Sequence, residues 1–491
     1  MNKKVVIIGA GIAGIATAIR LTTKGYQVEV FEANAYPGGK LSAFSLEQYR
    51  FDAGPSLFTM PHYVDELFEL CGENPRKHFN YHKKDIACQY FWEDGTRLTA
   101  FGDTTQYLQE VEKKLGVSPE VLKAYLAKAK KKYDLTVALF LEKSLHRWKT
   151  LFSLKTLKAL RHLTLFEINK SLDQVNTAAL KEPHLVQLYN RFATYNGSSP
   201  YQTPGIMSLI QHLESHYGTF IPEGGMVSIS NSLFDLAQRQ GVKFHFNQKV
   251  EKIITEKDRV KGVLVGGQKH FADCVVSNMD IYPTYRKLLP QAKAPEKTLK
   301  QERSSSAVIF YWGIKKSFPA LDLHNILFSE DYPGEFEAIF GAKQLFKDPT
   351  IYINITAKNV PTDAPSGHEN WFVMINTPVG ASIDWENEIP ALRKCVLTKI
   401  ERVLGEKIAP FIKAEEILSP PLIEEKTQSY LGALYGASSN NQMAAFLRHP
   451  NFSGQFKNLY FCGGSVHPGG GIPLCLLSAK IVSDEFSRLD D

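Results

Sequence analysis

The sequence has little of what marks exported or membrane-spanning proteins. None of its 491 residues falls in an uninterrupted apolar run of 18 or more, the length that a transmembrane helix needs. The six cysteines include no C-x-x-C pair, which argues against a zinc site and against a disulfide framework. The N-terminus passes from Met-Asn-Lys-Lys directly into a strand-like apolar run, without a signal-peptide pattern. We therefore expect two or three domains in a reducing, cytoplasmic compartment.

Acidic residues are scarce in one region of the chain. Residues 121–170 hold twelve Lys or Arg and three Asp or Glu, a local charge of +9 in a chain whose net charge is +6. No recognition motif for nucleic acid accompanies this basic region, so we expect no nucleic-acid partner.

The sequence also lacks the residue patterns of hydrolytic enzymes. No Ser-His-Asp order, carboxylate pair or cluster of metal ligands stands out, and we expect no metal site.

Residues 5–32 carry the pattern of a dinucleotide-binding unit. An apolar strand over 5–8 precedes a helix pattern that ends at Gly25, and a second strand over 28–31 ends at Glu32. Three glycines follow the first strand in the spacing G-x-G-x-x-G: Gly9, Gly11 and Gly14. The first permits a tight turn, the second lets the backbone approach a pyrophosphate, and the third allows close helix–strand packing. The pattern predicts FAD or NAD at the N-terminus of the helix.

Glu32 and the turn after it help to identify the dinucleotide. The carboxylate lies 18 residues beyond Gly14, where it can accept hydrogen bonds from a ribose, and its charge disfavours the 2′-phosphate of NADP. A Pro-Gly-Gly-Lys turn over 37–40 follows, in place of a second strand–helix–strand unit. Lys40 could contact a phosphate or a flavin edge, or the segment could be a plain β-turn with an incidental lysine.

Segments later in the sequence are predicted to complete the dinucleotide-binding unit that residues 5–32 begin. Residues 229–240 have a helix pattern, a strand-like segment over 250–253 is placed near the adenine, and a buried strand ends in Asn278. The chain closes with a strand, a glycine-rich loop over 463–471 and a helix that begins near Ile472. The glycines would let the backbone lie against the cofactor, and the helix N-terminus would face its negative edge. This return predicts a discontinuous dinucleotide-binding domain.

The middle of the chain predicts a second part that binds the substrate. Strand patterns (SSAVIFYWGI, TIYINITAK, NWFVMINTP) and a hairpin signal at Asp94-Gly95 indicate an antiparallel sheet, with helices from residues 105–218 beside it. We expect these elements to wall a long apolar channel. For any single aromatic residue among them, core packing is the commoner reason.

Within the basic region, apolar residues recur at helical spacing. They are Leu141, Leu145, Trp148, Phe152, Leu154, Leu157 and Leu160. The basic residues between them are Lys143, Arg147, Lys149, Lys155, Lys158 and Arg161. Such a helix can lie in an anionic membrane surface, where each basic residue adds about 1 kcal/mol. A surface helix whose apolar face packs on the protein core is an equal alternative.

The order of these motifs is similar to that of the bacterial phytoene-desaturase-type carotenoid desaturases, within the wider flavoprotein amine oxidase group. The matching segments are the G-x-G-x-x-G with Glu32, Pro37-Gly38-Gly39-Lys40, FDAGPSLFTMP (51–61), PEGGM (222–226), HNILFSEDYPGEFEAIF (324–340) and LYFCGGSVHPGGGIP (459–473). Within the group, the chain most resembles the hydroxycarotenoid 3,4-desaturases. The resemblance covers nearly the whole chain. It implies non-covalent FAD, a carotenoid substrate and peripheral attachment to the inner face of the membrane.

The resemblance also implies which residues hold FAD. The ADP half would be held by Gly9, Gly11, Ile12, Gly14 and Glu32, with Val250 and Asn278 beside the adenine. The flavin half would lie near Gly39, Lys40, Ser56, Leu57, Gly464, Gly471 and Ile472. Many relatives carry an Asp after the late glycine pair, where this chain has Ser465, so the implied role is weaker at that position.

The implied reaction is desaturation of an acyclic or hydroxylated carotene end at the 3,4 bond. One hydrogen would pass as hydride to flavin N5 and the other would leave as a proton. His467, in the glycine-rich loop, is the candidate for proton transfer, or it holds that loop in place. Turnover needs oxygen or a membrane quinone as electron acceptor. The alternatives are desaturation of phytoene or another carotene, carotenoid isomerisation, amine oxidation, and a flavin-free lipid-escort role resembling the Rab GDP-dissociation inhibitors.

These observations predict an α/β protein with two parts. One is a discontinuous, Rossmann-like FAD-binding domain of the glutathione-reductase type, over residues 1–73, 220–299 and 428–491. The other is an α+β substrate domain with an antiparallel sheet and a helical membrane-binding part, over residues 74–219 and 300–427. Both chain ends fall in the first domain, because the last strand and helix complete the unit that the first residues begin.

Overall fold

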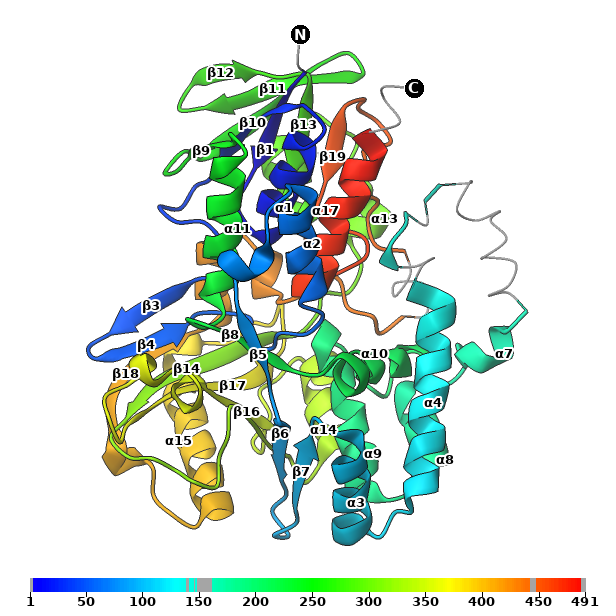
Figure 1. Ribbon diagram of the computed structural model, residues 1–491, viewed down its shortest axis with the longest axis vertical. Helices are drawn as coiled ribbons and strands as arrows, with labels where there is room; N and C mark the ends of the chain where they lie inside the picture. Colours follow the sequence, from blue (N-terminus) through cyan, green and yellow to red (C-terminus); the bar gives the residue numbers. More distant parts are fainter. Residues whose placement is uncertain (1–2, 138–140, 145, 148–160, 442–446, 487–491) are drawn as a thin grey trace.

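The computed structural model describes residues 3–137, 141–144, 146–147, 161–441 and 447–486 (Figure 1). A five-stranded sheet has the order β19-β13-β1-β2-β9, and all its neighbouring strands are parallel. Its strands are β1 (Lys4–Ile8), β2 (Gln27–Phe31), β9 (Lys243–His245), β13 (Cys274–Ser277) and β19 (Leu459–Phe461). They come from the beginning, the middle and the end of the sequence, so the sheet forms only when distant segments meet.

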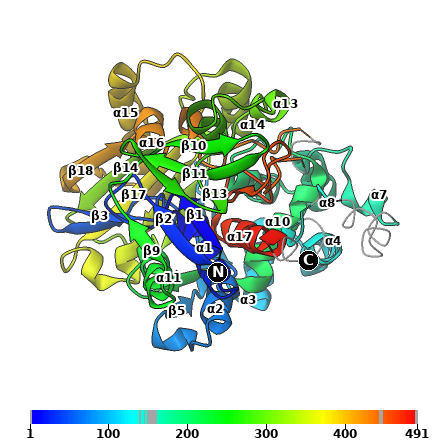
Figure 2. The ribbon, with the colours of Figure 1, turned by 90° about the horizontal axis from the view of Figure 1, so that it is seen from above.

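Side-chain alternation along β1 decides what covers each face of this sheet. Val5 and Ile7 pack against three helices, whereas Val6 and Ile8 pack against a small antiparallel sheet. These elements are α1 (Ile12–Thr22), α11 (Val227–Arg239), α17 (Ile472–Phe486), β10 (Val250–Glu256), β11 (Arg259–Val265) and β12 (Gln268–Phe271). Because both faces are covered, β1 is a continuous apolar run. Figure 2 shows the helices and the small sheet on opposite sides of the parallel strands.

A second large sheet lies below the first in Figure 1 and has the order β18-β14-β17-β16-β15-β6-β7. Its strands are β6 (Ile86–Phe91), β7 (Arg97–Phe101), β14 (Ser306–Ile314), β15 (His324–Leu327), β16 (Ile351–Ile355), β17 (Glu369–Thr377) and β18 (Ile412–Leu418). All pairs are antiparallel except β6 with β15. One face packs on α15 (Trp385–Leu404) through residues such as Phe310 and Val396. The predicted antiparallel sheet and its hairpin at Asp94 are confirmed.

Helices that follow β7 in the chain pack against β6 and β7. The helices of this region are α3 (Thr104–Leu115), α4 (Pro119–Thr136), α7 (Leu163–Phe166), α8 (Leu172–Leu180), α9 (Pro183–Asn190) and α10 (Ile210–His212). The remaining elements are α2 (His62–Leu70), α12 (Ile281–Pro283), α13 (Glu296–Leu299), α14 (Tyr332–Phe336), α16 (Pro420–Thr427), β3 (Ala43–Leu46), β4 (Tyr49–Asp52), β5 (Tyr81–Lys83) and β8 (Phe220–Pro222). Among the described helices, none combines the length and the apolarity that a membrane span requires.

The predicted amphipathic helix falls mostly outside the described residues. Outside them lie Leu145, Trp148, Lys149, Phe152, Leu154, Lys155, Leu157, Lys158 and Leu160. Of the part that is described, Arg147 donates from Nε to Glu485 of α17 at 3.0 Å, and its guanidinium lies 3.7 Å from the ring centre of Phe452. The choice between a membrane-bound helix and a core-packed helix therefore stays a prediction.

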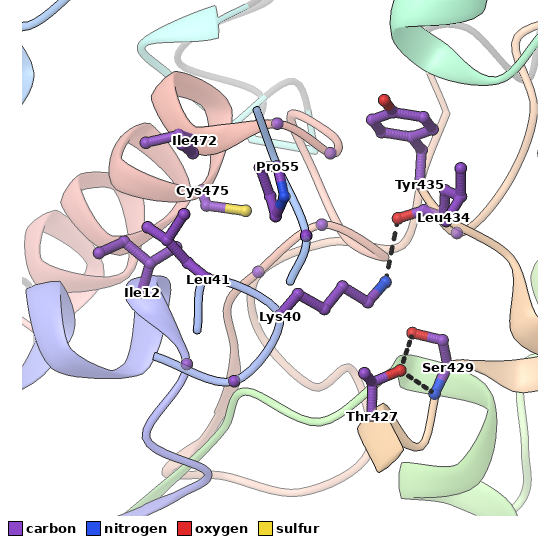
Figure 3. A pocket seen from close by; sticks show the side chains of 18 of the residues that line it. Ile12, Lys40, Leu41, Pro55, Thr427, Ser429, Leu434, Tyr435, Ile472 and Cys475 are labelled. Atoms are coloured by element: carbon purple, nitrogen blue, oxygen red, sulfur yellow. Dashed lines mark hydrogen bonds between the residues drawn. The ribbon is translucent and has the colours of Figure 1, made fainter. Parts of the chain in front are cut away.

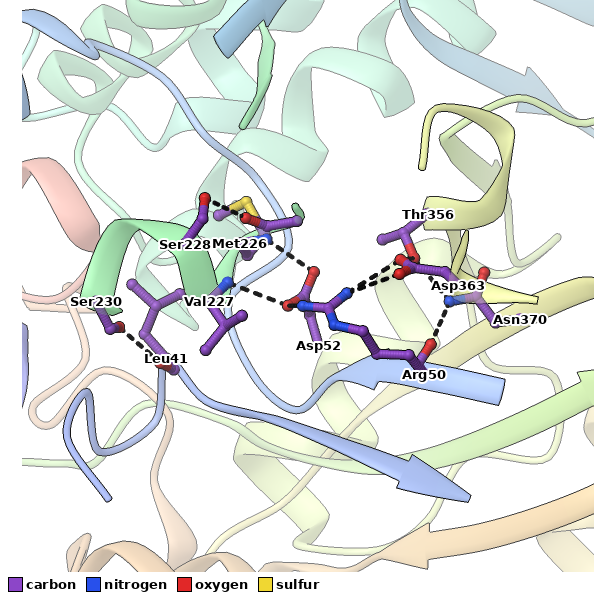
Figure 4. Close-up of polar contacts among 11 residues, drawn as sticks. Leu41, Arg50, Asp52, Met226, Val227, Ser228, Ser230, Thr356, Asp363 and Asn370 are labelled. Carbon is purple, nitrogen blue, oxygen red and sulfur yellow. Dashed lines mark hydrogen bonds and ion pairs between the residues drawn. The ribbon is translucent and has the colours of Figure 1, made fainter. Parts of the chain in front are cut away.

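An ionic network joins the β3–β4 hairpin to α11 and to the segment between β16 and β17 (Figure 4). Asp52 accepts hydrogen bonds from the backbone N–H groups of Met226 at 2.8 Å and Val227 at 3.1 Å, which satisfies free donors at the start of α11. Arg50 lies between two carboxylates, 2.8 Å from Asp52 and 3.1 Å from Asp363. The network fixes the position of the hairpin, which helps to wall the cavity described next.

Candidate active site

A continuous cavity of 1310 Å³ connects the carboxyl ends of the parallel strands with one face of the seven-stranded sheet. At the first end it is lined by Ile8, Phe31, Asn278 and Gly463, each at the end of a strand or within two residues after it. At the other end it is lined by Ile309, Tyr311, Ile326, Tyr352, Phe372 and Met374. The carboxyl ends of parallel strands are where dinucleotides bind in such sheets. The cavity exceeds the roughly 300–1,000 Å³ that one small ligand needs, so it has room for a second molecule.

Where the chain passes from β1 into α1, two glycines leave no space for a side chain. A Cβ on Gly14 would lie 2.2 Å from the carbonyl oxygen of Gly9, and one on Gly11 would lie 2.6 Å from Nδ2 of Asn278. Among the described residues, no side chain caps α1, so its first-turn N–H groups, beginning at Ile12, keep their capacity for an anion. A helix N-terminus of this kind fits a pyrophosphate.

Glu32 follows β2 and is held firmly in the cavity wall. Its carboxylate accepts hydrogen bonds from the N–H groups of Ala10 at 2.7 Å and Asn34 at 2.8 Å, and only 6% of the residue is exposed. Two oxygens with four acceptor positions still leave capacity for ribose hydroxyls. Val250, at the start of β10, lines the same end of the cavity. This end therefore suits the adenosine half of a dinucleotide.

Lys40 extends from the turn after β2 across the cavity (Figure 3). Its Nζ donates a hydrogen bond to the carbonyl oxygen of Leu434 at 3.0 Å. Burial lowers the pKa of this ammonium group, while the nearby Asp280 and Cys475 raise it. Gly39, which precedes Lys40, has a left-handed φ of +59° and lies against Gly11. The turn thus places the half-buried side chain of Lys40 beside the glycine turn of β1.

Ser56 and Leu57 lie in the cavity wall beyond Lys40. The Ser56 hydroxyl is 2.8 Å from the hydroxyl of Tyr352, and Tyr352 is in turn 2.7 Å from Nδ1 of His324. The segment that carries Ser56 packs tightly on the lysine turn, because a Cβ on Gly54 would lie 2.0 Å from the carbonyl oxygen of Lys40. A hydrogen-bond chain therefore runs from the cofactor end of the cavity to the seven-stranded sheet.

The glycine-rich loop lies between β19 and α17 and closes the cavity from the far side. Gly464, Gly471 and Ile472 all line the cavity, and α17 begins at Ile472 as predicted. A Cβ on Gly471 would meet no protein atom within 4 Å, so the space beside this residue is open. Ser465 accepts a hydrogen bond from the N–H of Ile281 at 2.9 Å. Its hydroxyl therefore holds the loop against the segment after β13.

His467 is buried in the same loop. Its Nε2 donates to the carbonyl oxygen of Lys143 at 2.9 Å, and its own carbonyl accepts from Nδ2 of Asn451 at 2.8 Å. Burial lowers the pKa of the imidazole to about 4, so the ring is neutral at pH 7. These contacts give His467 a structural role in the loop, and its proposed part in proton transfer stays a prediction.

Several polar residues of the cavity wall escaped the sequence analysis. They are Arg191, Tyr195, Glu214, His324, Glu335 and Tyr352. Burial raises the pKa of the Glu335 carboxyl to about 7, although Thr350 donates to it through both its N–H, at 2.9 Å, and its hydroxyl, at 2.7 Å. Each residue stands in an ordinary helical or strand pattern, and only the approach of separate elements brings them to one cavity. His324 and Glu335 fall in the segment 324–340 that resembles the desaturases, but nothing in the local pattern marked any of the six as a cavity residue.

These features fit FAD. The glycine turn, Glu32 and Lys40 lie together at one end of the cavity, where they would suit a dinucleotide, and the cavity continues past them. Fold and cavity together define a flavin-dependent oxidoreductase. The chain belongs to the flavin containing amine oxidoreductase family, whose model matches residues 12–486. The cofactor is FAD, and the residues assigned to hold it stay predictions.

Two relatives make the assignment more specific. The chain is 58% identical over 482 residues to a 1-hydroxycarotenoid 3,4-desaturase of Flavobacterium sp. (strain P99-3), with 98% of each chain covered. It is 33% identical over 493 residues to a 4,4'-diapolycopene oxygenase of Methylomonas sp, with 99% of this chain and 98% of that one covered. The carotenoid-desaturase resemblance of the sequence is thereby confirmed.

Solved structures of low sequence identity share the fold. Wild-type putrescine oxidase bound to putrescine has a TM-score of 0.64 at 14% identity, with 99% of each chain covered. Cyclohexylamine oxidase from Brevibacterium oxydans IH-35A has a TM-score of 0.61 at 15% identity, with 100% of each chain covered. The predicted fold class is thereby confirmed.

Proposed function

We propose that this enzyme desaturates a 1-hydroxylated acyclic carotenoid at its 3,4 bond. The observation that carries the proposal is the continuity of the cavity, which passes from the FAD-binding end into a channel along the seven-stranded sheet. Side chains from three strands give this channel an apolar wall: Ile309, Ile326, Phe372 and Met374. A polyene needs such a wall, and the 58% identity to a 1-hydroxycarotenoid 3,4-desaturase supports the choice of substrate.

The described residues do the binding and positioning in this reaction. FAD, when bound, supplies the acceptor for the hydride that leaves the substrate. Ile206, Met207, Leu209, Ile210 and Leu213 line the channel from the helical side, and with the sheet they hold the chain and exclude water. Lys40, whose ammonium is buried against the Leu434 carbonyl, adds a fixed positive charge at the cofactor end, where negative charge is stabilised.

Anaerobic incubation tests the proposed reaction. The FAD-loaded protein is mixed with hydroxylated, non-hydroxylated acyclic and cyclic carotenes, and products are separated by chromatography while flavin absorbance is followed. A product with one more conjugated double bond, formed with bleaching of the flavin, supports the proposal. A product of unchanged conjugation length indicates an isomerase, and a product that gains oxygen when air is admitted indicates an oxygenase. Oxidation of amines alone would overturn it.

We also propose peripheral attachment to the inner face of the membrane, with oxygen or a quinone as electron acceptor. The local charge of +9 over residues 121–170 and a bilayer-soluble substrate support this attachment. Co-sedimentation with vesicles of anionic and of neutral lipid tests it. Equal binding to both, unaffected by salt, would count against an electrostatic attachment. Rates of flavin reoxidation by air and by a soluble quinone identify the acceptor.

A further inference from the structure

A buried arginine lies in the wall of the channel, among apolar side chains and a few polar ones. Arg191 is only 9% exposed, and its guanidinium donates from Nη2 to the hydroxyls of Tyr90 at 3.2 Å and Tyr195 at 3.3 Å. The Tyr195 hydroxyl in turn donates to the carboxylate of Glu214. The buried cation and the half-buried carboxylate are therefore linked through one phenol, which offsets part of the cost of burying Arg191. Nε of Arg191 is buried and has no partner among the described residues.

His324, which lines the same cavity, holds a second buried donor without a partner among the described residues. The residue is 3% exposed, and its Nε2 has no hydrogen-bond partner among the described residues. Its Nδ1 lies 3.3 Å from Nδ2 of Asn354, which can only donate, and 2.7 Å from the hydroxyl of Tyr352. Nδ1 therefore accepts and Nε2 carries the hydrogen. Burial lowers the pKa of His324 to about 3, so the ring keeps this neutral form across the physiological range.

Two buried donors without partners are costly unless a ligand oxygen or water satisfies them. Each unsatisfied group costs about 1–3 kcal/mol, and an unsubstituted polyene has no atom that can accept their hydrogen bonds. We propose that His324 and Arg191 bind the hydroxyl oxygen of the carotenoid and thereby select hydroxylated chain ends. An alcohol oxygen has two lone pairs, one for each donor.

The position of His324 agrees with the bond that reacts, and this step rests on the proposed function. In a 1-hydroxylated carotenoid that reacts at carbons 3 and 4, two C–C bonds of about 1.5 Å each separate the hydroxylated carbon from the reacting bond. The hydroxyl must therefore be held next to the flavin. Tyr352 ties His324 at 2.7 Å and Ser56 at 2.8 Å into one chain, and Ser56 lies in the wall that continues from Lys40. His324 is thus at the junction of the cofactor end and the channel.

Tyr332 provides a matched control within the same cavity. Its hydroxyl, on α14, is also buried and without a partner among the described residues, so no described hydrogen bond links it to His324 or Arg191. Tyr332→Phe thus removes one unsatisfied polar atom from the cavity without touching the proposed donors. His324→Leu removes the donor, and His324→Gln replaces Nε2–H by an amide N–H of similar reach. Arg191→Lys keeps the charge opposite Glu214 but loses the Nε–H.

The experiment compares a 1-hydroxylated carotenoid with the non-hydroxylated carotenoid of the same chain length. For each FAD-loaded variant we measure kcat/KM and, separately, the dissociation constant from the perturbation of the flavin spectrum. His324→Leu and Arg191→Lys should each lower the preference for the hydroxylated substrate at least about tenfold, because the site loses a hydrogen bond that only this substrate makes. His324→Gln should retain it within about threefold, and Tyr332→Phe should leave it unchanged.

An unchanged preference in His324→Leu, or a loss in Tyr332→Phe instead, overturns the inference. Failure of the proposed function gives a different result, in which the wild-type protein desaturates neither carotenoid. The dissociation constants still test the hydroxyl site in that case, because they need no turnover. Equal wild-type affinity for the two carotenoids would reject the site.

Discussion

The ammonium group of Lys40 donates a hydrogen bond to the carbonyl oxygen of Leu434 at 3.0 Å, which joins the turn after β2 to the segment after α16. The two residues lie 394 positions apart in the sequence. Burial lowers the pKa of Lys40, because desolvation penalises its charged form. The negative groups of FAD, which Lys40 is predicted to face, would stabilise that charged form.

Lys40→Met should weaken FAD binding at least about tenfold, since the neutral side chain removes an attraction that acts in a buried site. Equilibrium titration of the apoprotein with FAD measures the loss. Lys249→Met is the matched control, because Lys249 also lines the cavity but is exposed. An equal loss in both variants would mean that general charge, and not the buried position of Lys40, governs the affinity.

Gly471→Val should abolish FAD binding while the fold is retained. The residue has φ +104°, and the space around its Cβ position is open, so the added side chain would occupy the cavity. Gly25→Val is the control. Gly25 has φ +85° and equally open surroundings, so it carries a similar backbone cost of about 1–2 kcal/mol away from the cavity. Flavin content after purification and circular dichroism compare the two. Full flavin in Gly471→Val would refute the placement of this loop.

Glu335→Gln should stabilise the protein above neutral pH. In the folded state burial raises the pKa of this carboxyl from an ordinary 4.5 to about 7, so the folded protein binds an extra proton between those values. Stability therefore falls as the pH rises through this window, by roughly 3 kcal/mol in total, and the penalty is complete above pH 7. The neutral amide keeps an acceptor for the Thr350 N–H and avoids the penalty.

Thermal unfolding of wild type and Glu335→Gln at pH 4.5 and pH 8 tests whether the ionised Glu335 destabilises the folded protein. We expect equal melting temperatures at the lower pH and a higher one for the variant at pH 8. A variant that is less stable at pH 8 would show that a partner keeps the carboxylate ionised.

His467→Gln should retain FAD and most of the activity. The Nε2–H of His467 is engaged with the Lys143 carbonyl, and a glutamine amide can make the same contact. A pKa of about 4 also leaves the ring neutral over the pH range in which it would have to exchange a proton. Flavin content, kcat and its pH profile measure the effect. A loss of kcat above about a hundredfold at full flavin content would instead assign His467 to the chemistry.

Local sequence patterns were sufficient to predict the secondary structure at the cofactor end of the molecule. The glycine spacing, the acid after β2 and the start of α17 each depend on a short segment whose backbone conformation follows from its own residues. Gly14 is an example, because a Cβ there would lie 2.2 Å from the carbonyl oxygen of Gly9, only five residues earlier in the chain. The exact division into domains and the individual roles of the assigned residues remain predictions.

The substrate end could not be predicted in the same way. The parallel pairing of β6 with β15 joins segments more than 200 residues apart, and nothing in either strand specifies its partner. Arg191 and His324 have the sequence surroundings of ordinary helix and strand residues. Only the tertiary structure shows that each of these residues has a buried donor without a partner among the described residues.

The sequence by itself therefore determined the class of cofactor and the strand–turn–helix unit that binds it, because those depend on backbone geometry over a few residues. The tertiary structure decided which polar groups are buried in the apolar channel and which of them lack partners. That distinction depends on desolvation, and desolvation is set by packing between segments far apart in the chain.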